Sequence, residues 1–256
     1  MTGSPGTLYL VPNTLDFGSA GSVTPIQDLM PLGVIRVAAA LGHWISENAK
    51  TTRAFLKRVD AVIPLAEPIQ SIRIVELPRP PKGGHGKAVT IDGPRLLAPA
   101  LEGRDLGLQS EAGLPGVADP GSEVVEAAHA MGIRVQPLPG ASSLLLALAA
   151  SGHNGQSFAF VGYLPSDPTA RSVRIKELEA LSRRHAQTQL MIETPYRNDA
   201  LLSALLAHLQ PSTRVSVSCG LTCPGAFTRS GSVGDWRKRL TRLPADVPAV
   251  FSLLSS

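Results

Sequence analysis

The chain has 256 residues, of which 43% are hydrophobic and 17% are charged. This is the composition of a globular protein that is long enough for one large or two ordinary domains, and it excludes an intrinsically disordered chain. The formal net charge of +4 at pH 7 is a mild basic excess, which permits an anionic partner such as RNA but does not require one.

The first half of the chain alternates β-rich apolar runs with segments in which apolar residues recur every three or four positions. The first pattern predicts buried strands, and the second predicts helices with one apolar face. An irregular loop is expected over 78–87. The predicted elements are, in order, strand 7–11, helix 25–40, strand 43–45, helix 50–59, strand 71–77, a helix ending at 101, strand 106–110, helix 120–131 and strand 133–138.

The second half repeats this alternation without repeating the sequence. Leu144 to Ala150 is apolar on all sides, which predicts a helix buried between layers. Two α/β domains, 1–138 and 139–256, with a cleft between them are therefore expected. The predicted elements are helix 144–150, strand 158–163, a helix capped by Ser166-Asp167-Pro168, strand 188–192, a helix capped by Asn198, strand 215–219, strand 226–230, a short basic helix 235–240 and strand 247–254.

Several classes of protein are not supported by the sequence. Cys219 and Cys223 lack nearby His or Cys partners, so they predict small buried side chains in a reducing compartment and no metal site. The first six residues do not form a secretory signal, and the longest strongly apolar run is too short to cross a membrane. The usual phosphate-loop, serine-hydrolase, zinc-protease and nicotinamide-binding motifs are missing. We expect a soluble, cytoplasmic protein without membrane contact.

Two glycine-rich loops follow predicted strands, in LQSEAGLPGVADPGSEVV (108–125) and in RVQPLPGASS (134–143). Asp119 is expected as a helix N-cap, with Pro120 at the first helical position. Such loops at the carboxyl ends of strands let bare backbone approach a ligand closely. Together with the strand-end segments at 12–14 and 193–197, they suit a polar, zwitterionic molecule with a flat adenine-like end. A sulfonium cofactor fits that description, because its cationic centre needs no phosphate cradle.

Five segments, GTLYLVP, SEAGLPGVADPG, RVQPLPGASS, SFAFVGYLP and IETPYRN, occur in this order in S-adenosylmethionine-dependent methyltransferases of the tetrapyrrole methylase fold. The chain resembles that family over roughly residues 6–254. Within it, the chain looks like a short, divergent relative of the ribosomal RNA small subunit methyltransferase I family. Members of that family modify a cytidine ribose 2′-hydroxyl. The resemblance implies two α/β domains with S-adenosylmethionine in the cleft between them, and commonly a homodimer.

The motif matches also imply which residues bind the cofactor. The sequence departs from the family at Asn13 to Gly18, where relatives read P-T-P-I-G-N after the strand. It departs again at Glu47 to Lys50, where they read E-D-T-R, and at Glu111, where they have Asp. We therefore expect cofactor binding to be retained and the acceptor side to be remodelled. The implied cofactor-binding residues are Pro12, Ser110, Glu111, Ala112, Gly113, Pro139, Gly140, Ala141, Ser142, Glu193 and Tyr196.

The acceptor side rests on fewer residues, each with an ordinary alternative. Glu47 is a candidate general base for a hydroxyl, or it caps the helix that follows. Glu111 contacts the cofactor or is a plain loop carboxylate. Trp44 and Tyr196 are candidates to stack a base, although Trp44 on a strand favours the core. A phosphate-binding rim or merely a solvated face is predicted for a set of cations: Arg53, Lys57 and Arg58 with Lys82 and Lys87, to which Arg197 is added as a substrate contact.

The leading hypothesis is methyl transfer from S-adenosylmethionine to a ribose hydroxyl of ribosomal RNA, without a metal. One alternative is a methyltransferase that acts on a small tetrapyrrole-like acceptor, which the resemblance also permits. Another is a paralogue that binds the cofactor without catalysis, which the altered loop at 13–18 suggests.

Overall fold

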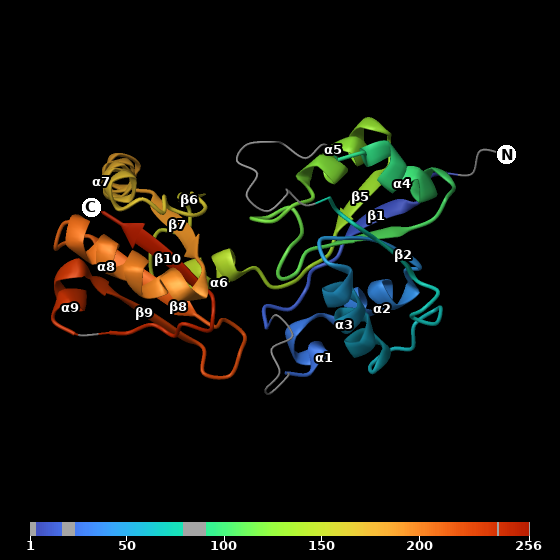
Figure 1. The fold of residues 1–256 in the computed structure, drawn as a ribbon, viewed down its shortest axis with the longest axis horizontal. Helices are drawn as coiled ribbons and strands as arrows, with labels where there is room; N and C mark the ends of the chain where they lie inside the picture. Colours follow the sequence, from blue (N-terminus) through green and yellow to red (C-terminus); the bar gives the residue numbers. More distant parts are fainter. Residues whose placement is uncertain (1–3, 17–23, 79–90, 240, 256) are drawn as a thin grey trace. The chain divides into compact units, whose positions relative to one another are not determined.

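The computed structural model describes residues 4–16, 24–78, 91–239 and 241–255. The chain folds into two compact units, Met1–Ala141 and Ser142–Ser256, each built on one five-stranded sheet (Figure 1). The predicted α/β class with two sheets is confirmed. Lys82, Lys87 and most of the loop predicted over 78–87 lie outside the described residues, as do residues 17 and 18 of the altered first loop.

The sheet of the first unit is parallel throughout, with the strand order β3-β2-β4-β1-β5. In the register of the central strands, Leu8 lies opposite both Leu106 and Val135. Because all five strands run the same way, their carboxyl ends meet at one edge of the sheet. The strands are β1 (Thr7–Leu10), β2 (His43–Ser46), β3 (Arg73–Glu76), β4 (Leu106–Gln109) and β5 (Arg134–Pro137).

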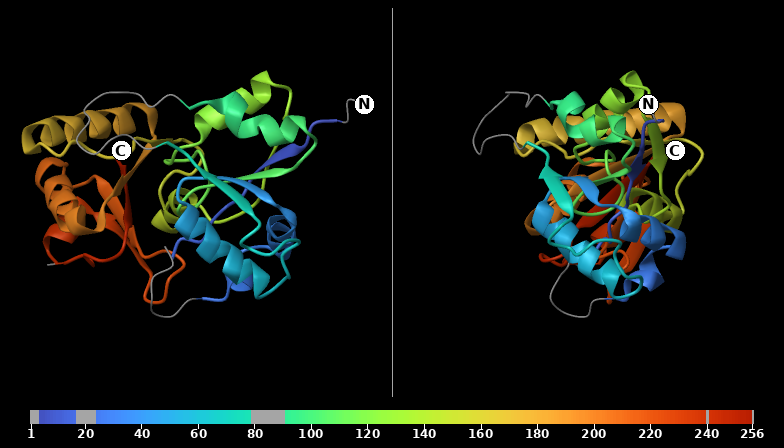
Figure 2. Two further views of the ribbon diagram at one scale, coloured as in Figure 1. Left: turned by 45° about the vertical axis from the view of Figure 1, so that its right-hand side comes forward. Right: turned by 90° about the vertical axis from the view of Figure 1, so that its right-hand side faces the viewer.

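Helices cover both faces of this sheet, which explains why its inner strands are apolar on both sides (Figure 2). Trp44 packs on one face, edge-on to Phe55 at 6.1 Å between ring centroids, and its neighbour Ile45 packs on the other. Trp44 is 1% exposed, so its prediction as a core residue is confirmed and base stacking by this side chain is wrong. One face carries α1 (Ile26–Leu29), α2 (Leu32–Ala40) and α3 (Ala49–Asp60), and the other carries α4 (Gly93–Leu101) and α5 (Ser122–Ala130).

Two helix boundaries in this unit differ from the predicted ones. The single helix predicted over 25–40 is divided, because Pro31 has no N–H and holds Met30 in an extended conformation. The helix predicted to begin at Pro120 begins at Ser122, with Gly121 at its N-cap and no side-chain cap. Asp119 is therefore not a helix cap, and its carboxyl is left for other contacts.

The second unit has a mixed sheet with the order β6-β7-β10-β8-β9, in which β6 and β7 pair in parallel and the other described neighbours pair antiparallel. Asp167 accepts a hydrogen bond from the Ala170 amide at 2.8 Å and caps the next helix, as predicted. Asn198 does not cap its helix. The elements are α6 (Ser143–Ser151), β6 (Phe158–Phe160), α7 (Pro168–His185), β7 (Thr188–Glu193), a 3-10 turn (Pro195–Arg197), α8 (Asn198–His208), β8 (Arg214–Cys219), β9 (Phe227–Ser232), α9 (Val233–Arg237) and β10 (Ala249–Leu254).

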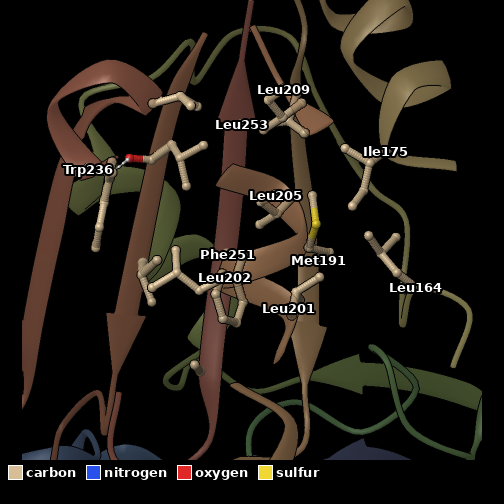
Figure 3. Close-up of a cluster of buried hydrophobic side chains, with 14 of the residues drawn as sticks. Leu164, Ile175, Met191, Leu201, Leu202, Leu205, Leu209, Trp236, Phe251 and Leu253 are labelled. Carbon is tan, nitrogen blue, oxygen red and sulfur yellow. Dashed lines mark hydrogen bonds between the residues drawn. The ribbon is translucent and has the colours of Figure 1, made fainter. Parts of the chain in front are cut away.

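The main core of the second unit lies between its sheet and the helices α7, α8 and α9 (Figure 3). Phe251 and Met191 meet the leucines of α8, and the Trp236 indole donates a hydrogen bond to the Val215 carbonyl at 3.0 Å. Helix α6 packs on the opposite face. It is not buried on all sides as predicted, since Leu145 is 52% exposed and Leu146 is 39% exposed.

Smaller points follow from the same packing. Cys219 is buried as predicted, and burial raises the pKa of its thiol to about 11, while Cys223 is only half-buried. Asn198 is the first residue of α8 and donates its amide to the carbonyls of Pro244 and Val247. No helix in the described ranges is both long enough and apolar enough to cross a membrane.

Candidate functional site

The carboxyl edge of the parallel sheet brings together loops that are far apart in the sequence. The chain after β1 bonds to β4 through Val11 N and Leu108 O at 2.9 Å. The chain after β5 bonds to β1 through Leu138 N and Leu10 O at 3.0 Å, and Glu47 after β2 donates its amide to Gln109 O at 3.0 Å. The loops that follow β2, β4, β1 and β5 therefore start side by side.

Asn13 holds the first glycine-rich loop through hydrogen bonds from its backbone and its side chain. Its backbone exchanges two hydrogen bonds with Gly113, at 2.8 and 3.2 Å. Its side-chain amide donates to the carbonyls of Ser110 and Glu111 at 3.2 and 3.0 Å, and the residue is 4% exposed. The residue that departs from the family pattern after β1 thus has a structural role here, which sequence reasoning missed.

Bare backbone lies at the centre of this edge. A Cβ added to Gly140 would lie 2.3 Å from Pro12 Cβ, so the second glycine-rich loop packs directly on the end of β1. Gly113 adopts a φ of +69°, a conformation that favours glycine. The structure therefore gathers the predicted cofactor-binding residues of the first unit: Pro12, Ser110, Glu111, Ala112, Gly113, Pro139, Gly140 and Ala141.

Two carboxylates at this edge, Glu47 and Glu111, connect the loops that follow β2 and β4 through hydrogen bonds. Glu47 Oε2 accepts a hydrogen bond from the Glu111 amide at 3.0 Å, and Glu111 Oε1 accepts one from Asn48 Nδ2 at 2.6 Å. The cap of α3 is Asn48, which accepts from the amides of Lys50 and Thr51. The alternative in which Glu47 caps that helix is therefore wrong.

Asp119 is a third carboxyl at the same place, and sequence reasoning did not select it as a site residue. Burial raises its pKa to about 7, with further contributions from the negative charges of Glu47 and Glu111. The pattern DPG before an apolar helix resembles an N-cap, which hid this role. A cue was available in the glycines and prolines on both sides of Asp119, because they place it in a loop at a strand end.

Buried polar groups without partners adjoin these acids. Ser110 is 2% exposed and Gln109 is 1% exposed, yet neither the Ser110 hydroxyl nor the Gln109 amide has a hydrogen-bond partner in the part of the chain that the structure describes. Each such group costs about 1–3 kcal/mol. A polar ligand that supplies the missing hydrogen bonds would remove that cost, so this edge fits a ligand with hydroxyl, amino and carboxylate groups.

A basic stripe begins next to the acids. Asn48, the N-cap residue of α3, contacts Glu111, and the helix exposes Lys50, Arg53 and Lys57 at helical spacing. Arg58 does not belong to this stripe as hypothesised. Its guanidinium binds the Asp16 carboxylate at 3.0 Å, the Thr14 hydroxyl at 2.9 Å and the Thr24 carbonyl at 2.8 Å, and so holds the first loop.

The remaining predicted site residues lie in the second unit. Glu193 is 3% exposed, and its carboxylate accepts from the Thr194 amide at 2.8 Å and pairs with Arg197 at 3.0 Å. Arg197 also donates to the Ser166 hydroxyl at 2.8 Å. Ser142 is buried just before α6, whereas Tyr196 is 78% exposed. The cofactor and substrate roles of these residues stay predictions.

Among the described residues, no group of three or more His, Cys, Asp or Glu side chains has the arrangement of a metal site. Of the three acids at the sheet edge, Glu47 and Glu111 accept hydrogen bonds from neighbouring residues, and Asp119 is coupled to both by charge.

Comparisons with known proteins give a family. A family model described as Tetrapyrrole (Corrin/Porphyrin) Methylases matches residues 45–236. The "Ribosomal RNA small subunit methyltransferase I" of Xylella fastidiosa is 31% identical over 84% of this chain and 67% of that protein. The protein of the same name from Halalkalibacterium halodurans is 30% identical over 78% of this chain and 60% of that protein.

The crystal structure of the methyltransferase CobJ matches with a TM-score of 0.56 and 17% identity, over 98% of this chain and 100% of that one. This likeness shows a shared fold and nothing more. Several curated relatives are longer than this chain, which spans 60% of the Halalkalibacterium protein and 56% of its namesake from Bacillus subtilis.

Proposed function

The chain belongs to the tetrapyrrole (corrin/porphyrin) methylase family, and from this premise we propose that it transfers a methyl group from S-adenosylmethionine to a ribose hydroxyl of ribosomal RNA. Members of the family use S-adenosylmethionine as methyl donor. The resemblance predicted from the sequence motifs is confirmed. The observation that carries the proposal is the carboxyl edge of the parallel sheet, where bare backbone and unpartnered polar groups meet three acids.

The cofactor side of the proposal rests on the loops after β1, β4 and β5. The unpartnered Ser110 hydroxyl and the backbone of the exposed Gly140 offer donors and acceptors to the ribose and the amino-acid end of the cofactor. Bound S-adenosylmethionine supplies a methyl group already activated by its sulfonium, so the protein has to align the acceptor and exclude water. In the second unit, Ser142, Glu193 and Tyr196 are proposed as further cofactor contacts.

The acceptor side of the proposal rests on charge and on the named relatives. Lys50, Arg53 and Lys57 form an exposed cationic stripe on a helix that starts beside the acids. Phosphate groups of an RNA strand can bind such a stripe while a ribose reaches the acids. The relatives named above are called ribosomal RNA methyltransferases. Arg197 is proposed as an additional substrate contact.

Two properties of the whole protein belong to the same proposal. We place it in the cytoplasm, where ribosomal RNA is modified, and we propose a homodimer, as the family resemblance implies. Sedimentation in analytical ultracentrifugation with and without cofactor measures the second property. A single species of monomer mass in both conditions would contradict it.

Two measurements, made in sequence, test the function. Calorimetry first measures whether S-adenosylmethionine and its demethylated product bind, and we expect one site per chain. Methyl-labelled cofactor is then offered with small-subunit RNA from cells that lack the gene, and in parallel with a tetrapyrrole acceptor. Label in RNA alone supports the proposal. Label in the tetrapyrrole alone would replace the acceptor, and binding without any transfer would leave a cofactor-binding protein without this activity.

A further inference from the structure

The three acids at the sheet edge differ in how far they are already engaged. Glu47 receives the amide of Glu111, and Glu111 receives the side chain of Asn48, so both carboxylates are tied to neighbouring loops. The Asp119 side chain makes no hydrogen bond or ion pair with any described residue, and it interacts with the other two acids only through their charge. Asp119 is therefore the carboxyl of the three that is available to a ligand.

The backbone holds Asp119 in place at some cost. Ala118, directly before it, has a φ of +65°, which a residue with a Cβ adopts only under constraint. Gly121, just after Pro120, has a φ of +130°, and a Cβ there would lie 3.2 Å from the Leu108 side chain of β4. The loop is thus shaped by the strand beneath it, and the position of Asp119 does not depend on a bond from its own side chain.

A ligand is indicated independently at the start of the same loop. Ser110 and Gln109 are both at least 98% buried, and their polar side-chain atoms have no partner within the described ranges. Ser110 adjoins Glu111 in the chain, and Glu111 acts electrostatically on Asp119. Unsatisfied buried groups at the end of β4 and a carboxyl without a hydrogen bond in the loop that follows it form a site that needs a polar molecule to complete it.

We propose that Asp119, and not Glu47, accepts the proton of the acceptor hydroxyl, and that Glu47 and Glu111 position the loop around it. The inference rests on the proposed function. As the hydroxyl oxygen forms its bond to the methyl carbon, the carbon–sulfur bond breaks and its electron pair stays on sulfur. The hydroxyl proton goes to the Asp119 carboxylate, which later returns it to solvent.

The electrostatics of the cluster support this assignment. A proton acceptor works best when its pKa lies near the working pH. Burial and the neighbouring acids raise the pKa of the Asp119 carboxyl to about 7. Within the part of the chain that the structure describes, the charged groups that act on it are Glu47 from the end of β2 and Glu111 from the end of β4. Both are negative, so both make Asp119 a stronger base than an isolated aspartate.

The test compares Asp119→Asn and Asp119→Glu with Glu126→Gln, which removes a carboxylate from the exposed face of α5 in the same segment. We expect Asp119→Asn to lower kcat at least about 100-fold, since general bases contribute that much or more. The affinity for the demethylated cofactor by calorimetry should change less than about threefold. Asp119→Glu should recover part of kcat, and Glu126→Gln should behave as the wild type. Far-ultraviolet circular dichroism confirms that each variant is folded.

Two further readouts separate proton transfer from a structural role. The kcat of the wild type should rise with pH through about 7 and then level off, and Asp119→Asn should lose this rise. An NMR titration of the unliganded protein should place the Asp119 carboxyl near the same pH, and Glu47→Gln should lower that midpoint. A midpoint near the ordinary aspartate value, or an Asp119→Asn variant with wild-type kcat, would overturn the inference.

Failure of the inference and failure of the proposed function look different. If the wild type methylates RNA and Asp119→Asn does so equally well, only the role of Asp119 is wrong. If the wild type binds cofactor but methylates no RNA, the proposed function fails and the inference falls with it. If Asp119→Asn loses cofactor affinity together with kcat, Asp119 is a binding residue and not the proton acceptor.

Discussion

The Asp119 carboxylate lowers the stability of the folded protein near neutral pH, because it is partly buried beside two other acids. Its pKa is raised from 3.8 to about 7, so the folded protein binds a proton there that the unfolded chain has already released. Replacement by a neutral side chain of the same shape would relieve the repulsion from Glu47 and Glu111 and stabilise the fold. A protein keeps a destabilising carboxyl of this kind when function needs it.

This gives a prediction for Asp119→Asn. Because the folded-state pKa lies above the unfolded one, wild-type stability falls as pH rises between about 4 and 7. The variant lacks this loss, so its gain in Tm over the wild type should be larger at pH 8 than at pH 4. After allowance for partial exposure, the difference is on the order of 1–2 kcal/mol. Thermal unfolding at the two pH values measures it, and an equal effect at both would contradict the raised pKa.

A second residue-scale prediction concerns the packing of Gly140 on Pro12. Gly140→Ala places a Cβ 2.3 Å from Pro12 Cβ, so it should destabilise the protein by about 1–3 kcal/mol and weaken binding of the demethylated cofactor at least tenfold. Gly33→Ala is the matched control, since a Cβ there meets nothing within 4 Å and α2 gains a better helix former. Calorimetry and thermal unfolding check both variants. Unchanged cofactor affinity in Gly140→Ala would place the cofactor away from this loop.

Sequence reasoning reached some of these residues and missed others for a physical reason. Gly113 and Gly140 are visible in the sequence because a glycine-rich loop after a strand has a recognisable local pattern. The contact between Glu47 and Glu111 joins residues 64 positions apart, and no local pattern reports it. The two hydrogen bonds between Asn13 and Gly113 also join residues that are far apart in the sequence. The sequence alone therefore showed Asn13 as a departure from the family pattern and did not show its structural role.

At the scale of elements, helix α3 combines a structural and a proposed functional surface. Arg58 ties the helix to the loop after β1, while Lys57 beside it is exposed. The basic segment in the sequence could not separate these roles, because the separation depends on which face of the helix meets Asp16.

Adjacent substitutions test this division. Arg58→Gln removes contacts to Asp16, Thr14 and Thr24 and should lower the free energy of unfolding by about 1–3 kcal/mol. Lys57→Gln should leave stability within about 0.5 kcal/mol of the wild type. It should instead weaken RNA binding and reduce the salt dependence of that binding by about one phosphate contact. Urea unfolding and RNA binding at several salt concentrations measure the two effects, and the assignment is wrong if the two variants exchange behaviours.

The elements themselves were largely predictable, and their ends were not. Alternating strand and helix patterns located the strands that contain Trp44 and Leu108, because buried strands need apolar residues. The division of the first helix at Pro31 and the start of α5 at Ser122 depend on backbone angles at Met30 and Gly121. An aspartate followed by proline fits a helix start equally well when those angles are not known.

At the scale of the whole molecule, the alternation of elements predicted two α/β units, and the described sheets confirm that class. The strand order was beyond sequence reasoning, since β1 pairs with β4 and β5 across long stretches of chain. That order matters for function, because it places β1 and β4 at the centre of the first sheet and so brings Pro12, Glu47 and Ser110 to one edge. The predicted junction between residues 138 and 139 stays a prediction.

The most direct test of the account is to find where the methyl group goes. Purified protein is incubated with methyl-labelled S-adenosylmethionine and small-subunit RNA from cells that lack the gene, and the RNA is then digested to nucleosides. We predict that the label appears in one ribose-methylated nucleoside, with Glu126→Gln as active as the wild type and Asp119→Asn at least about 100-fold slower. Label on a base, or no label from a protein that calorimetry shows to bind the cofactor, would contradict the proposed reaction.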